Sequence, residues 1–164
     1  MGCPVDVEFA VTSPEEGIWR LNLLQCRPLQ TAKSEQVHIP DGVDHEFLFD
    51  VRRTSMRRSK EEPIDYIVWV DPQKYYEYEY AKKPDVARLI SRINQHFEDT
   101  DKKLMLLVPG RIGTSSPELG VPVVYSEISQ FNAICEVAYD KAGYHPDLSY
   151  GSHMFQDMVE ADVY

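Results

Sequence analysis

The sequence predicts an α/β fold with a mostly parallel central sheet and flanking helices, preceded by an N-terminal β-hairpin. Alternating apolar and polar residues on both sides of a turn-forming segment predict the hairpin. Short apolar runs without alternation predict the central strands, because strands of a parallel sheet are covered on both faces. We expect these strands at Ile64–Val70, Leu104–Val108 and Ala133–Tyr139.

The length and composition are those of a folded protein with one ordinary domain and a sizeable core. The chain has 164 residues, of which 43% are hydrophobic and 27% are charged. The net charge of -10 argues against general binding to nucleic acid or to an anionic membrane, because the summed field repels phosphate. No apolar run approaches the roughly 20 residues of a membrane helix. Three widely spaced cysteines form neither a disulfide framework nor a zinc pattern, so we expect a cytoplasmic location.

The N-terminal hairpin is predicted from two alternating runs, Val5–Val11 and Ile18–Arg27. The segment between them, Thr12–Gly17, contains the residue types that favour turns. Alternation along a strand places Asp6 and Glu8 on one face of the first strand.

The second strand of the hairpin carries the polar partners of these acids. The same alternation places Leu23, Gln25 and Arg27 together on one face. If the two faces coincide, a carboxylate, an amide and a guanidinium converge, which suits Mg²⁺ and a polyphosphate. The alternative is an amphipathic hairpin whose polar face meets water.

Residues 31–44 are polar and punctuated by proline and glycine, and we interpret them as a linker between residues 1–30 and a domain at 45–164. Within that domain, Arg52–Lys60 contains five basic residues in nine. One interpretation is that this segment binds an anion or is phosphorylated. The alternative is a solvated loop without a ligand. Tyr75–Tyr80 is either a binding surface or a half-buried edge or loop.

Two helices are predicted in the larger domain. Pro84–Phe97 has apolar residues at helical spacing, with proline and aspartate in the first turn. Because this helix lies between two predicted strands, we expect a parallel βαβ unit with a right-handed crossover. Ser152–Ala161 has apolar pairs four residues apart and a serine suited to cap the helix.

A glycine-containing loop follows the Leu104–Val108 strand and is a candidate anion site. Backbone N–H groups of such a loop can approach a ligand closely, and arginine adds a planar charged fork. A histidine in the first turn of the last helix can assist, since N–H groups are unsatisfied there. The alternatives are an ordinary exit loop and a capping-region histidine without a ligand. The candidate anion-binding residues are Gly110, Arg111, Gly113, Thr114, Ser115 and His153.

The hairpin resembles the last hairpin of the ATP-grasp domain of phosphoenolpyruvate synthase and pyruvate phosphate dikinase. The resemblance rests on Asp6–Phe9 and on Leu24–Pro28, which reads Leu-Gln-Cys-Arg-Pro. It implies that Glu8, Gln25 and Arg27 help to bind ATP, with Glu8 and Gln25 holding Mg²⁺ in the full domain. The rest of that domain has no match in these residues. The resemblance therefore implies a fragment of a longer phosphotransferase, which is inactive alone and has the rest of the parent polypeptide as its partner.

The C-terminal third resembles the C-terminal region of a subgroup of phosphoenolpyruvate synthase-like proteins. The resemblance rests on Gly110–Val123, Glu127–Ser129 and Tyr150–Asp157. Ile112 and Met154 stand where the subgroup carries aromatic residues. The phosphohistidine motif and the enolpyruvate-binding barrel of the complete enzymes have no match here.

Three hypotheses follow. The first is a fragment of an ATP-dependent phosphotransferase that contributes part of an Mg–ATP site and an accessory domain. The second is a binding or interaction module for a small anionic metabolite, without catalysis of its own. The third is a domain that only braces a neighbouring nucleotide domain.

Overall fold

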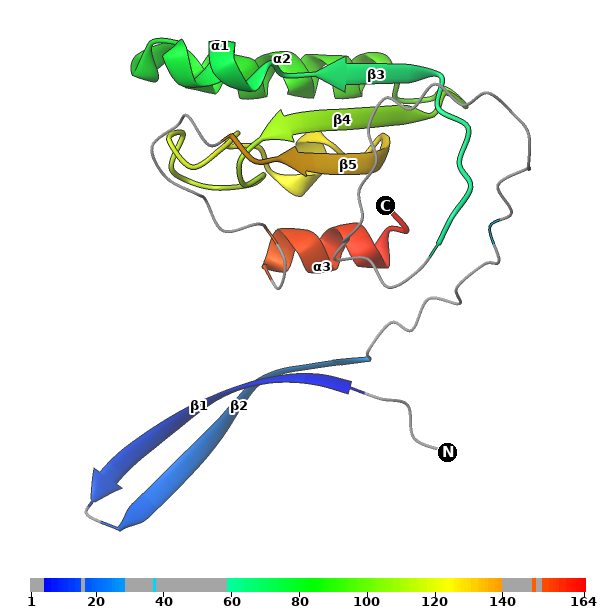
Figure 1. The fold of residues 1–164 in the computed structure, drawn as a ribbon. Helices are drawn as coiled ribbons and strands as arrows, with labels where there is room; N and C mark the ends of the chain where they lie inside the picture. The colour runs from blue at the N-terminus through cyan, green and yellow to red at the C-terminus, as the bar shows by residue number, and fades with distance from the viewer. Residues whose placement is uncertain (1–4, 16, 29–36, 38–58, 140–148, 150–151) are drawn as a thin grey trace. The chain divides into compact units, whose positions relative to one another are not determined.

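The computed structural model describes residues 5–15, 17–28, 37, 59–139, 149 and 152–164 (Figure 1). The chain divides into two compact units, Met1–Lys33 and Ser34–Tyr164, which we describe separately. The predicted linker lies outside the described residues except for Val37. The basic segment Arg52–Lys60 also lies outside them, except for its last two residues.

The first unit is the predicted antiparallel hairpin of β1 (Val5–Glu15) and β2 (Ile18–Pro28). Both strands are longer than predicted. Polar residues that favour turns, such as those after Val11, continue β1 because a two-stranded ribbon needs only a short connection. The predicted hairpin is confirmed, and the predicted turn is too long.

A β-bulge in β2 changes which side chains share a face. Glu8 pairs with Gln25, whereas the next residue, Phe9, pairs with Leu23, so Leu24 is the extra residue. Paired residues project to the same face, and neighbours along β1 project to opposite faces. Leu23 therefore lies on the face opposite Gln25, and the predicted grouping of Leu23 with Gln25 and Arg27 is wrong.

The bulge has a clear effect on the ribbon, because it gathers the polar side chains, together with Ala10, on one face. On one face lie Asp6, Glu8, Ala10, Thr12, Arg20, Asn22, Gln25 and Arg27. On the other lie Val5, Val7, Phe9, Val11, Leu21, Leu23 and Cys26. Without the extra residue, the polar side chains at the two ends of β2 would point in opposite directions.

The second unit contains the predicted parallel sheet, in the order β3 (Tyr66–Trp69), β4 (Leu104–Pro109) and β5 (Phe131–Val137). The fold class is thus confirmed as mixed α/β. β5 begins two residues before the predicted strand. Tyr164 extends the sheet, because its N–H donates to Asn132 O at 2.9 Å and its carbonyl accepts from Ile134 N at 2.7 Å.

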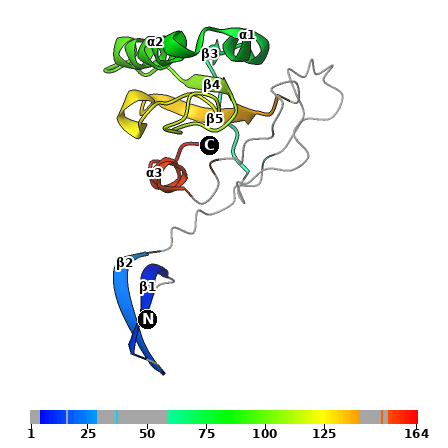
Figure 2. The ribbon, with the colours of Figure 1, turned by 90° about the vertical axis from the view of Figure 1, so that its left-hand side faces the viewer.

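Helices cover one face of this sheet. The helix α2 (Lys83–His96), the 3₁₀ turn η2 (Tyr125–Glu127) and α3 (His153–Glu160) lie on the same side of the strands (Figures 1 and 2). Both predicted helices are confirmed, and Ser152 caps α3 by accepting from Phe155 N at 3.2 Å. None of the helices in the described segments is both long and apolar enough to cross a bilayer.

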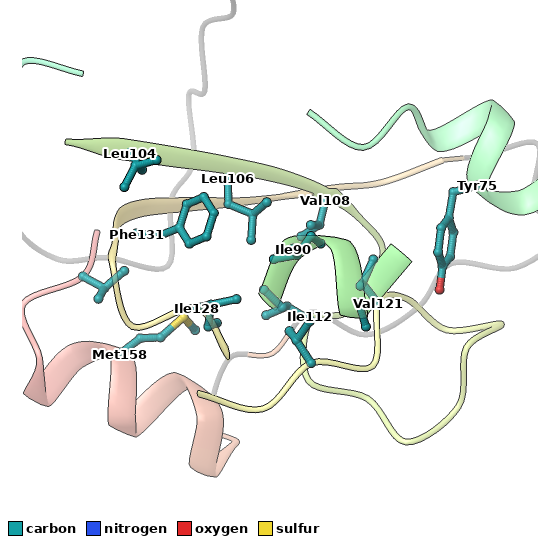
Figure 3. Packing of buried hydrophobic residues seen from close by; sticks show 13 residues of the cluster. Tyr75, Ile90, Leu104, Leu106, Val108, Ile112, Val121, Ile128, Phe131 and Met158 are labelled. Carbon is teal, nitrogen blue, oxygen red and sulfur yellow. The ribbon is translucent and has the colours of Figure 1, made fainter. Parts of the chain in front are cut away.

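The core lies between β4 and these helices (Figure 3). Alternate residues of β4 point into this core. The largest fully buried side chain of the core is Phe131, the first residue of β5. The buried side chains that Figure 3 labels are Tyr75, Ile90, Leu104, Leu106, Val108, Ile112, Val121, Ile128, Phe131 and Met158. Asn94 is a polar member of this region and links α2 to the η2 segment, since its amide donates to Ser126 O at 3.3 Å and accepts from Gln130 N at 2.8 Å.

The tyrosine-rich segment differs from the prediction. α1 (Pro72–Glu77) and the 3₁₀ turn η1 (Tyr80–Lys82) replace the expected edge or loop. Asp71 starts α1 by accepting from Lys74 N at 3.2 Å, and Pro72 follows it at a position that proline favours.

The side chain of Lys83 contacts the last turn of α1. Its buried ammonium donates to the carbonyl of Tyr75 and lies 4.2 Å from the centroid of the Tyr75 ring. Cations are stabilising at the carboxyl end of a helix and over an aromatic face. Burial lowers the pKa of Lys83, and the negative charge of Glu118 opposes this shift.

An ionic cluster joins Lys60 and Glu62, which precede β3, to Asp162 near the end of the chain. Lys60 Nζ lies 2.9 Å from Glu62 and 3.1 Å from Asp162, and Lys103 Nζ lies 3.3 Å from Glu62. The hydrogen bond with Lys60, followed by that with Lys103, holds the pKa of Glu62 below its usual range.

This cluster makes the free energy of unfolding of the larger unit fall as the pH is lowered into the acidic range. Because the folded-state pKa of Glu62 is lowered, its stabilisation is complete above the unfolded-state pKa and is lost as the pH falls through the folded-state value. We expect Glu62→Gln to lower the free energy of unfolding by up to about 1 kcal/mol at neutral pH and to have no effect in strong acid. Urea titrations of both proteins at the two pH values measure this difference. An equal loss at both would contradict the ionic explanation.

Candidate functional site

The polar face of the hairpin is the first candidate site. Asp6 pairs with Arg27 and Glu8 with Gln25 across the two strands. Directly opposed residues have Cβ atoms about 5 Å apart, so these four side chains form one compact patch. Within it, Arg27 Nη2 donates to Gln25 Oε1 at 2.9 Å. Glu8, Gln25 and Arg27 are each half-buried.

This patch offers the ligand chemistry of magnesium but not a complete site. Mg²⁺ prefers oxygen ligands and usually combines one or two protein groups with phosphate oxygens and water. Glu8 supplies a carboxylate and Gln25 an amide oxygen, which keeps a second lone pair when Arg27 donates to it. Among the described residues, no group of three or more histidine, cysteine or acidic side chains is arranged to hold a metal. The residues therefore fit a phosphate-bound Mg²⁺ that also has ligands from elsewhere.

The second candidate site is the loop that follows β4, at the carboxyl end of the parallel sheet (Figure 1). In open α/β sheets, ligands bind at this end. The loop closes on itself through an isolated bridge between Gly110 and Gly120. Gly110 has a φ of +66° and Gly113 a φ of +72°, which is the left-handed region that glycine favours.

Most of the loop N–H groups are used inside the protein. Gly110 N donates to Val137 O at 3.0 Å, Arg111 N to Leu119 O at 2.8 Å and Gly113 N to Val121 O at 3.1 Å. Ile112 N donates to Glu136 Oε1 at 2.8 Å. The glycines predicted to bring N–H groups toward an anion therefore shape the loop instead, and an anion here would depend on side chains.

Glu136, near the end of β5, organises this region and was missed by the sequence analysis. Besides the bond from Ile112, its carboxylate accepts from Ser149 N at 2.9 Å and from the Ser149 hydroxyl. Ser149 Oγ also lies 3.1 Å from Ile112 O. Ile112 and Ser149 are almost completely buried, at 1% and 2% exposed. A single carboxylate thus joins β5, the loop after β4 and the segment before α3. No local pattern in the sequence marks it.

The side chains predicted for the anion site are distributed around this loop. Arg111 is half-buried, and its guanidinium forms no ion pair within the described part of the chain. Thr114 is buried, and its hydroxyl accepts from Ser116 N at 3.1 Å, so it stabilises the turn. Ser115 and His153 are exposed.

The first turn of α3 lies against the loop. A Cβ atom on Gly113 would lie 2.7 Å from Met154 Cε, so the residue after His153 packs on Gly113. Ile112 is a member of the hydrophobic core, and Met154 packs against that core.

No protein-family model, curated protein or solved structure matches this chain.

Proposed function

We propose that the chain contributes one hairpin of an Mg–ATP site, together with an α/β accessory domain, to a cytoplasmic ATP-dependent phosphotransferase similar to phosphoenolpyruvate synthase and pyruvate phosphate dikinase. The observation that carries the proposal is the direct pairing of Glu8 with Gln25, with Arg27 bonded to Gln25 on the same face. This pairing supports the resemblance, because a one-residue change of register would place Glu8 and Gln25 on opposite faces.

Each residue has a chemical role in this proposal. Glu8 and Gln25 would provide oxygen ligands for the metal, and Arg27 orients the Gln25 amide and places a positive charge beside it. Glu8 and Gln25 would hold Mg²⁺ when it is bound, and the ion would supply positive charge that stabilises the transferring phosphoryl group. The remaining walls of the nucleotide site belong to the rest of the parent polypeptide.

A second candidate function is a binding module for a small anionic metabolite, independent of catalysis. The observation that favours it is Arg111, which has no ion-pair partner among the described residues and lies in the loop that packs on the first turn of α3. Arginine binds carboxylate and phosphate groups through two parallel hydrogen bonds. His153 would add a donor from the helix.

Calorimetric titration with Mg–ATP, inorganic phosphate and phosphoenolpyruvate tests both proposals. The leading proposal predicts no ATP turnover by this chain alone.

In the longer polypeptide, we expect Glu8→Ala to lower ATP-dependent turnover by about a hundredfold or more, since the loss of one charge-stabilising group typically costs this much. Thr12→Ala, on the same face but remote from the patch, should leave turnover unchanged.

The outcomes separate the two functions. Anion binding by this chain that is lost in Arg111→Ala but retained in Glu8→Ala would establish the module. A clear rate of ATP hydrolysis by the chain alone, or full activity of Glu8→Ala in the longer polypeptide, would refute the leading proposal.

A further inference from the structure

Within its own unit, the apolar face of the hairpin carries a row of exposed large apolar side chains. Its members are large side chains that expose 40–63% of their surfaces: Val5, Val7, Phe9, Val11, Leu21 and Leu23. Trp19 and Leu24, on the same strand as Leu21, expose 75% and 65%. A two-stranded ribbon is marginal without a layer against its apolar side. The ribbon itself is drawn in blue in Figure 1.

We infer that this face packs against the same face of a second copy of the chain, as a two-layer β-sandwich. The inference does not rest on the proposed function and concerns this chain by itself, because in a longer polypeptide the rest of the proposed nucleotide domain would compete with a second copy for this face. Two sheets pack face to face about 10 Å apart, with their apolar side chains interdigitated. A twofold axis allows one patch to serve both copies. The patch carries no charged residue, so two copies meet without buried charge.

The available area agrees with such a pair. The six members of the face expose about half of their surfaces, so the face is on the order of 500 Å² per copy, the size at which an exposed apolar patch marks an interaction site. The pair would bury about 1,000 Å² in total, at the lower limit of a specific interface. We therefore expect a dimer that dissociates on dilution.

The geometry leaves the polar face free. Glu8 and Gln25 project away from the apolar face, so the dimer does not compete with a ligand at the polar patch. Cys26 pairs with Val7 on the apolar face and is exposed in the single chain. In the dimer its thiol would be covered, and this gives a local probe.

Sedimentation velocity and alkylation of the full chain test the inference. As concentration rises, we expect the apparent mass to increase from 18.9 kDa toward twice that value. Phe9→Glu should remain monomeric, because it places a charge in the centre of the interface. Thr12→Glu is the matched control, since it adds the same charge to the same strand on the opposite face, beside Arg20, and it should dimerise as the unaltered chain does.

Alkylation of Cys26 in the unaltered chain provides a second measurement, which does not depend on how a variant folds. Peptide mass spectrometry follows the modification of this cysteine by iodoacetamide. The rate should fall by about tenfold where roughly nine chains in ten are dimeric. A chain that stays monomeric, a Phe9→Glu variant that still dimerises, or a dimer whose Cys26 reacts at the monomer rate would each overturn the inference.

Discussion

Replacement of Glu136 by valine is expected to lower the free energy of unfolding of the α/β unit by about 3 kcal/mol or more. The carboxylate accepts from Ile112 N, Ser149 N and the Ser149 hydroxyl, and both partner residues are buried. Each buried donor that loses its acceptor costs about 1–3 kcal/mol, because neither water nor another group replaces the bond. Urea denaturation followed by far-ultraviolet circular dichroism measures the loss.

Glu136→Gln is the matched control for this prediction. The amide keeps one acceptor oxygen at nearly the same volume, so we expect it to recover about half of the loss. Because Ile112 follows Arg111, the valine variant should also weaken any anion binding that depends on the Arg111 side chain. A Glu136→Val protein within about 0.5 kcal/mol of the unaltered chain would show that this carboxylate does not hold the loop.

Gly110→Ala is expected to destabilise the same unit by about 3 kcal/mol or more. Two effects add at this position. The φ of +66° is strained for any residue with a Cβ atom, which costs about 1–2 kcal/mol. The new Cβ would also lie 2.3 Å from the Leu119 backbone oxygen, so the bridge between Gly110 and Gly120 has to open.

Gly113→Ala separates these two effects. Its φ of +72° carries a similar conformational cost, but the nearest atom to a new Cβ is the methyl carbon of Met154, at 2.7 Å. This is the end of a flexible side chain, which can rotate away. We expect a loss of about 1–2 kcal/mol, clearly smaller than for Gly110→Ala, in the same denaturation experiment. Equal losses would mean that the backbone contact with Leu119 contributes nothing.

Local pattern was sufficient for several elements, for reasons that can be named. The alternation of Val5–Val11 and the helical spacing of Pro84–Phe97 reflect which side chains face apolar surroundings, and β1 and α2 follow them. The unalternating run at Leu104–Val108 became the central strand β4, buried between its neighbours. The α1 helix was missed because its tyrosines suggested an edge, although Asp71 and Pro72 contain a helix-start signal.

The sites depended more strongly on tertiary structure. Alternation alone grouped Leu23 with Gln25, and only the pairing of the strands revealed the bulge that separates them. The glycine loop was predicted to offer N–H groups to an anion, yet Val137, Leu119 and Val121 accept most of them. Glu136 has no local signature at all, because its partners lie 24 and 13 residues away along the chain.

The sequence by itself determined the fold class, the hairpin, both main helices and the central strands, since these follow from the periodicity of apolar residues within one segment. The tertiary structure decided which polar groups meet: Glu8 with Gln25, and Glu136 with Ile112 and Ser149. The physical reason is that burial of one face of a helix or strand requires apolar residues at regular spacing along that segment of the sequence. A hydrogen bond, in contrast, joins two atoms whose proximity exists only after distant segments have packed.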